Sequence, residues 1–93
     1  MKYYVYILSC SDETFYTGYT NNLRRRLNQH NGKGFFKGAK YTSKRRPVFL
    51  EHIENFSTRK DAMKREKEIK HFSHKEKQEI INSATKFEIL SAI

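Results

Sequence analysis

The stretch from Tyr16 to His30 (YTGYTNNLRRRLNQH) constrains the fold more than any other part of this sequence. It begins with the aromatic and β-branched residues typical of a strand and then offers asparagine caps for a strongly basic helix. Arg26 and His30 are four residues apart, which places both side chains on one helix face. We therefore expect a guanidinium, an imidazole and the Tyr16 phenol to meet at one place, where they would suit a phosphate.

A first strand is expected upstream, from Tyr3 to Ser9 (YYVYILS). Only a short turn separates it from the strand Thr14 to Thr20, so the two strands should form an antiparallel hairpin that brings Tyr6 near Tyr16. Gly18 lies inside the second strand, where a glycine marks a bulge or a close approach of another group. We assign it a structural role: keeping the strand thin where a phosphate backbone approaches.

Downstream of the basic helix, the pattern predicts one more strand and two more helices. A glycine-rich basic loop over residues 32–46 leads to the strand, Val48 to Phe56 (VFLEHIENF). The first of the two helices spans about Thr58 to Lys70, and the second starts at Ser73 with a capping box. The expected order of elements is therefore β-β-α-β-α-α.

Size and charge limit what such a chain can do. Residues 1–93 contain no repeat or linker, and we interpret them as a single domain. A net charge of +9 favours a polyanionic partner, either nucleic acid or an anionic membrane surface. We expect neither a signal peptide nor a membrane span, because no apolar stretch approaches the ~20 residues that a span requires. The single cysteine, Cys10, excludes an intrachain disulfide and a Cys-rich zinc site, and it fits a reducing cytoplasm.

Glu66 is the acid with the strongest claim to a chemical role. On its helix it lies in line with Ala62 and Ile69, so it should face inward more than a surface acid does. A partly buried carboxylate near cations suits Mg²⁺, which prefers oxygen ligands. The alternative is an ordinary helix-surface ion pair with Lys70 at i+4.

The basic loop mixes positive charge with an aromatic residue, a combination that binds phosphates and stacks a base. The alternative is a disordered basic loop with no ligand. Together with one arginine of the basic helix, we assign these residues to nucleic-acid binding: Arg24, Lys40, Tyr41, Thr42, Lys44, Arg45 and Arg46.

Taken in order and with their spacing, these motifs resemble the GIY-YIG nuclease family, in its small single-domain URI-like form. The first family motif stands here as Tyr4-Val5-Tyr6, with Tyr4 in place of glycine, and the second as Tyr16-Thr17-Gly18, with threonine in place of isoleucine. The match continues through the basic helix to the helix around Glu66. It covers residues from about 3 to 72 and leaves 73–93 as a C-terminal helix and tail.

The resemblance implies a three-stranded, mainly antiparallel sheet flanked by helices. It also implies hydrolysis of DNA phosphodiester bonds with one divalent ion, expected to be Mg²⁺ or Mn²⁺. Because one carboxylate is too few for an all-protein cage, we expect this ion to bind well only when DNA is present. Carried over by position, Tyr6 is the candidate general base, Tyr16 positions the water or shares that role, and Arg26 neutralises the scissile phosphate. His30 supports the same site, and Glu66 holds the metal.

We therefore expect a cytoplasmic endonuclease, structure-selective or weakly sequence-specific, that acts in DNA repair or recombination. Its partner would be DNA, including branched or single-stranded forms, and not a membrane; the oligomeric state is left open. One alternative is a non-catalytic nucleic-acid-binding module with the same fold. A further alternative is a protein-interaction adaptor.

Overall fold

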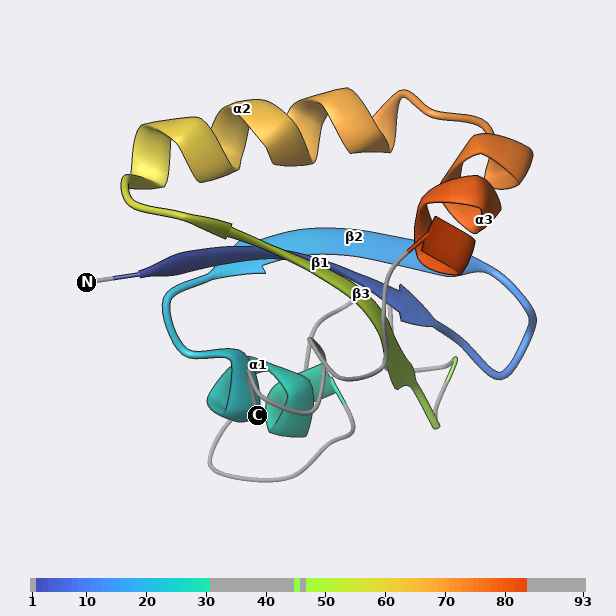
Figure 1. Ribbon diagram of the computed structural model, residues 1–93. Helices are drawn as coiled ribbons and strands as arrows, with labels where there is room; N and C mark the ends of the chain where they lie inside the picture. The colour runs from blue at the N-terminus through green and yellow to red at the C-terminus, as the bar shows by residue number, and fades with distance from the viewer. Residues whose placement is uncertain (1, 31–44, 46, 84–93) are drawn as a thin grey trace.

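A computed structural model of the chain describes residues 2–30, 45 and 47–83. It confirms the expected α+β fold and the order β-β-α-β-α-α (Figure 1). The strands are β1 (Tyr3–Ser9), β2 (Phe15–Thr20) and β3 (Phe49–Phe56), and the helices are α1 (Leu23–His30), α2 (Arg59–Lys70) and α3 (His74–Ser83). Apart from Arg45, the predicted basic loop over 32–46 lies outside the described residues, as does the tail from residue 84.

β1 is the central strand of a sheet whose order is β2-β1-β3. Both pairings are antiparallel, so the predicted hairpin of β1 and β2 is confirmed and the sheet is antiparallel throughout. In this register Tyr6 stands opposite Gly18 on β2 and opposite Ile53 on β3. The register therefore places the central tyrosine directly beside the glycine of the edge strand.

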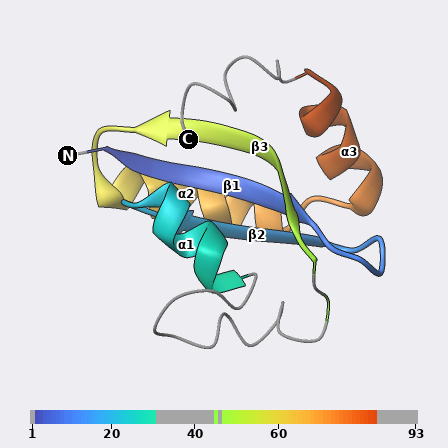
Figure 2. The same cartoon turned by 90° about the horizontal axis from the view of Figure 1, so that it is seen from below.

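Helices cover both faces of the sheet: α1 lies against one face, and α2 and α3 lie against the other (Figures 1 and 2). A strand covered on both faces has no solvent side, which explains why β1 is apolar or aromatic at almost every position. The buried core is Tyr6, Leu8, Cys10, Leu23, Val48 and Ile53 on the α1 face, and Val5, Ile7, Ala62 and Ile69 on the other.

Short polar side chains fix where the helices begin. The Asn22 side chain accepts a hydrogen bond of 3.1 Å from a backbone amide in the first turn of α1. Thr58 does the same for α2 at 3.2 Å. The predicted capping box of α3 is confirmed, because Ser73 and Glu76 exchange side-chain-to-backbone hydrogen bonds of 2.9 and 3.1 Å. Across the ranges 2–30, 45 and 47–83, no helix has the length and apolar character needed to cross a bilayer.

Candidate functional site

The Tyr6 ring lies over Gly18, across the edge strand β2. A Cβ atom added at Gly18 would stand 2.5 Å from the Tyr6 hydroxyl and 2.7 Å from the ring carbon that carries it. Any side chain there would therefore displace the phenol. The space left by the missing side chain of Gly18 is thus taken by the Tyr6 phenol, and the approach of a phosphate backbone at Gly18 stays a prediction.

Three aromatic rings from three different elements meet around this point. The Tyr6 hydroxyl lies 2.9 Å from Nε2 of His30. The ring centroids of Tyr16 and His30 are 4.8 Å apart, and those of Tyr6 and Tyr16 are 6.3 Å apart. Tyr6 is 2% exposed and His30 is fully buried, whereas Tyr16 is only partly buried. Of the two phenols, Tyr16 is thus the one that a ligand can reach.

Arg26 completes the positive side of this cluster. One Nη atom of Arg26 donates a hydrogen bond of 2.9 Å to the Gln29 side chain. Burial lowers the pKa of Arg26, but its interactions with the neighbouring phenols of Tyr6 and Tyr16 outweigh burial and raise that pKa. The guanidinium therefore stays charged beside the two phenols. The structure brings together the phenol, guanidinium and imidazole that the sequence pattern placed at one spot.

The environment of Tyr6 does not favour a phenolate. Burial raises the pKa of Tyr6 well above its ordinary value, and the neighbouring Tyr16 raises it further; hydrogen bonding from Arg26 lowers it only in part. In the protein as it stands, Tyr6 is a neutral phenol at physiological pH.

Glu66 approaches the cluster from α2, which packs on the opposite face of the sheet. Its side chain is 18% exposed and lies 3.5 Å from Lys70 Nζ, so both the inward position and the ion pair considered from the sequence are present. The Glu66 charge also raises the pKa of Tyr6. This is the smallest of the influences on that pKa, and it is electrostatic.

The side chains of the candidate site could bind a divalent ion only if a substrate supplied further ligands. Within the described ranges, no group of three or more His, Cys, Asp and Glu side chains gathers to hold a metal. Of the candidate site residues that the structure describes, Glu66 is the one with a carboxylate, and Mg²⁺ is commonly bound through one or two carboxylates with substrate phosphates and water. The residues therefore fit an ion shared between Glu66 and a bound phosphate, and they do not fit an all-protein cage.

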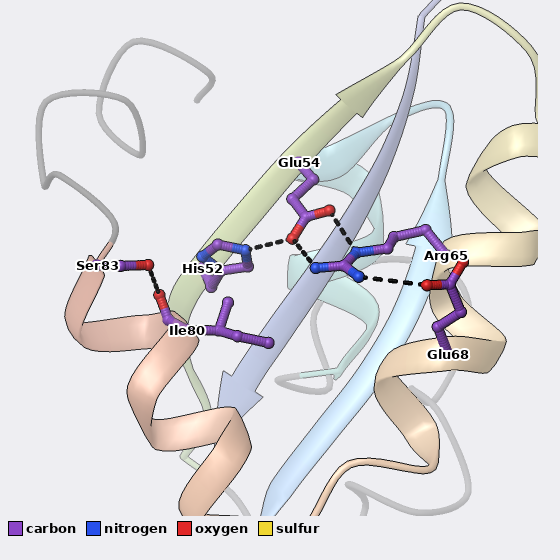
Figure 3. A network of polar contacts seen from close by, with 6 residues as sticks. All are labelled: His52, Glu54, Arg65, Glu68, Ile80 and Ser83. Carbon is purple, nitrogen blue, oxygen red and sulfur yellow. Dashed lines mark hydrogen bonds and ion pairs between the residues drawn. The ribbon is translucent and has the colours of Figure 1, made fainter.

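A partly buried polar network holds α2 in register with the sheet (Figure 3). Arg65 donates to both oxygens of Glu54 at 2.8 and 3.2 Å, and His52 donates to the same carboxylate at 2.9 Å. Arg65 also pairs with Glu68 at 3.5 Å. The hydrogen bond from His52, followed by those from Arg65, outweighs burial and lowers the pKa of Glu54 to about 2. Since Glu66 follows Arg65 directly, this network fixes the phase of the helix that carries the candidate metal ligand.

The residues assigned to nucleic-acid binding fall into three groups. Arg24 is exposed on α1, on the same helix as Arg26. Arg45 lies at the β1–β2 turn, where its Nε is 3.0 Å from the Asp12 carboxylate and its carbonyl oxygen accepts a hydrogen bond from the backbone amide of Ser11. Part of its charge is thus balanced within the fold. The other five, Lys40, Tyr41, Thr42, Lys44 and Arg46, lie outside the described residues.

One set of residues beside the site was not singled out from the sequence. Arg59 at the start of α2 donates a hydrogen bond of 3.2 Å to the Tyr19 hydroxyl on β2. Arg59, Met63, Glu66 and Lys70 are spaced i, i+4, i+7 and i+11, which is one helix stripe. Extending the helical phase of Glu66 in both directions is the signal that identifies them.

Comparison with known proteins places these features in context. A family model described as the GIY-YIG catalytic domain matches residues 2–79. A UPF0213 protein of Staphylococcus haemolyticus is 51% identical over 80 residues, covering 86% of this chain and 94% of that protein. A UPF0213 protein of Haloquadratum walsbyi is 48% identical over 83 residues, covering 89% of this chain and 90% of that protein.

Solved structures resemble the chain as well. The solution NMR structure of a UPF0213 protein from Bacillus halodurans is 42% identical, with a TM-score of 0.55 over 88% of this chain and 84% of that one. The solution NMR structure of a protein from E. faecalis is 36% identical, with a TM-score of 0.60 over 89% and 85% of the two chains. The names of these relatives state no activity, so they establish kinship and fold.

Proposed function

This chain belongs to the GIY-YIG family of catalytic domains, and from that premise we propose that it is an endonuclease that hydrolyses DNA phosphodiester bonds with one divalent ion, Mg²⁺ or Mn²⁺. One observation carries the proposal: Tyr6, Tyr16, Arg26 and His30 converge from three elements, and the charge of Glu66 reaches the same phenol. A phosphate held between Arg26 and Glu66 would lie beside the phenols of Tyr6 and Tyr16. Binding a phosphate requires only the guanidinium, whereas hydrolysis also uses the carboxylate and the two phenols.

Arg26 is the group proposed to hold the scissile phosphate. A guanidinium is a planar fork that donates two parallel hydrogen bonds to a phosphate, and it stabilises charge that develops on the phosphoryl oxygens. The hydrogen bond to Gln29 orients the guanidinium beside Tyr6 and Tyr16 before the substrate arrives. Such preorganisation avoids reordering a long side chain during the reaction.

A proton path follows from the donors and acceptors around Tyr6. The Tyr6 hydroxyl lies 2.9 Å from Nε2 of His30, and we assign the hydroxyl as the donor and Nε2 as the acceptor of this hydrogen bond. We propose that Tyr6 takes a proton from the attacking water as it passes its own proton to His30, while Tyr16, the less buried phenol, positions that water. A relay of this kind does not require a phenolate in the resting protein.

Glu66 is proposed to supply the carboxylate ligand of the ion. When bound, a divalent ion stabilises charge on the phosphate and on the leaving oxygen. Lys70 balances Glu66 in the absence of substrate. Movement of this ammonium group onto the DNA backbone would free the carboxylate, which agrees with an ion that binds well only together with DNA.

A non-catalytic nucleic-acid-binding module is the second candidate. The Glu66–Lys70 ion pair favours it, because a permanently paired carboxylate would serve only the helix. The two candidates differ in one respect: only the nuclease needs Glu66 for its activity.

Wider aspects of the function follow from the kind of contacts available. Basic side chains bind the phosphate backbone without reading bases. We therefore propose structure-selective or weakly sequence-specific cleavage of DNA, branched and single-stranded forms included. We also propose that the protein acts in DNA repair or recombination in the cytoplasm.

A nicking assay tests the nuclease directly. Supercoiled plasmid and labelled duplex, single-stranded, flap and branched DNAs are incubated with wild type and with Glu66→Ala in Mg²⁺ or Mn²⁺. Glu68→Ala is the matched control, because it removes a more exposed carboxylate from the same helix. The proposal requires cleavage by wild type and by the control and none by Glu66→Ala, with DNA binding retained by all three.

A further inference from the structure

The first turns of α2 carry a surface feature that the proposed reaction does not use. An open depression of about 540 Å³ is lined by Arg59, Lys60 and Met63. Met63 is 45% exposed, one of only two large apolar side chains so exposed within the described residues. Met63 is therefore an exposed apolar side chain between two cations. A partner that carries negative charge and some apolar surface would bind there.

Among residues 2–30, 45 and 47–83, no acid forms an ion pair with Arg59 or Lys60 in this depression. The Arg59 guanidinium donates to the Tyr19 hydroxyl, and the groups that act on its pKa are Tyr19 and Tyr3, which are phenols. Asp61 is the acid of the first turn of α2. It stands roughly 200° around the helix from both Arg59 and Met63, at about 100° per residue, and so faces away from the depression. An anion is therefore the complementary ligand.

The depression lies along the same helix as the candidate metal ligand Glu66. Arg59, Met63 and Glu66 lie on one stripe of α2. Seven residues at about 1.5 Å each place Arg59 roughly 10 Å along the helix from Glu66. On a duplex that follows α2, this distance corresponds to about three nucleotide steps of roughly 3.4 Å. A strand whose phosphate lies at Glu66 would thus pass over the depression within three nucleotides.

We propose that this depression binds the DNA strand on one side of the cleavage point, and this inference rests on the proposed nuclease function. Arg59 and Lys60 contact backbone phosphates, and Met63 packs against the deoxyribose between them. Tyr19 holds the Arg59 guanidinium in its bound orientation from the neighbouring strand. The DNA would thus contact the protein at a second point, on the regular helix α2 and at a set distance from Glu66.

The test measures DNA binding and does not depend on cleavage. Fluorescence anisotropy of a labelled duplex is followed from 50 to 200 mM salt, without divalent ions, for wild type and for Arg59→Gln/Lys60→Gln. Each phosphate contact contributes about 0.9 to the slope of log K against log salt, so the double variant should reduce the slope by about 2. The matched control is Lys64→Gln/Lys75→Gln, which removes two exposed lysines outside the depression and should change the slope by much less.

The outcomes separate this proposal from the proposed function. An unchanged slope in a folded Arg59→Gln/Lys60→Gln variant, or an equal reduction in the control, overturns the depression as a DNA contact. A changed oligomer mass by sedimentation with an unchanged slope also overturns it, because the occupant is then a second copy of the chain. If wild type does not nick DNA but the slope falls as expected, the nuclease is lost and the depression still stands as a DNA-binding surface.

Discussion

The Tyr6 hydroxyl lies 2.9 Å from Nε2 of His30, and the two side chains are almost completely removed from solvent. This contact joins the central strand to the end of α1, so it belongs to the core as much as to the candidate site. A nucleophile or base in open solvent would not need such burial. The pair is better explained as a fixed proton path whose geometry is set by the fold.

Tyr6→Phe should damage both stability and activity. The change keeps the ring over Gly18 but leaves Nε2 of His30 buried without its partner, which costs about 1–3 kcal/mol. Nicking should fall by a factor of about 10² to 10⁴ if the hydroxyl relays a proton. Thermal unfolding and plasmid nicking are measured side by side. Tyr4→Phe is the control on the same strand face, and equal nicking by both variants would remove Tyr6 from the mechanism.

Gly18→Ala should destabilise the protein although the change is a single methyl group. The new Cβ would stand 2.5 Å from the Tyr6 hydroxyl, which is closer than side chains tolerate. Overpacking of this kind costs about 1–3 kcal/mol. A double-mutant cycle with Tyr6→Ala should show a coupling energy of about 0.5 kcal/mol or more, since the smaller side chain removes the clash. Strictly additive effects on chemical unfolding would contradict the contact.

Arg26→Lys should keep the charge and lose most of the activity. A lysine cannot hold a phosphate with two parallel hydrogen bonds, nor can it contact two phenols and a phosphate together. Loss of one preorganised donor reduces kcat by about 10²–10³. Arg25→Lys, an exposed position on the same helix, is the matched control. Similar kcat values for the two lysine variants would show that charge alone is sufficient at Arg26.

Acid should destabilise the fold through Glu54. Its pKa is lowered from 4.5 to about 2 in the folded protein. The stabilisation is therefore fully present well above pH 4.5, and about 3 kcal/mol is lost progressively as the pH falls from about 5 to below 2. The groups facing this carboxylate are His52 and Arg65, with Glu68 on the far side of Arg65.

Urea unfolding at several pH values measures this effect, with Glu54→Gln as the comparison. The variant should be less stable near pH 7 and should lose less stability than wild type on acidification. Parallel pH profiles for the two proteins would mean that other carboxylates determine the acid sensitivity.

The elements of the fold were predictable because local patterns determine them. Aromatic and β-branched runs marked the strands, and the Ser73–Glu76 pair marked the start of α3. The meeting of Arg26 and His30 followed from helical spacing alone.

The contacts that depend on tertiary structure could not be predicted from the sequence. That Tyr6 lies over Gly18 depends on hairpin register, which the turn sets with a positive φ of 68° at Glu13. The burial that raises the pKa of Tyr6 depends on the placement of α1 against the sheet. The Arg45–Asp12 ion pair joins residues 33 positions apart, and no local pattern signals it.

Cleavage by Glu66→Ala tests the central claim most directly. Single-turnover nicking of supercoiled plasmid in Mg²⁺ or Mn²⁺ is compared for wild type, Glu66→Ala and Glu68→Ala, with anisotropy confirming that all three bind DNA. We predict that Glu66→Ala binds DNA as well as or better than wild type and does not nick it, while Glu68→Ala nicks normally. Nicking by Glu66→Ala at the wild-type rate, or DNA binding without nicking by wild type itself, would contradict the account of a metal-dependent nuclease.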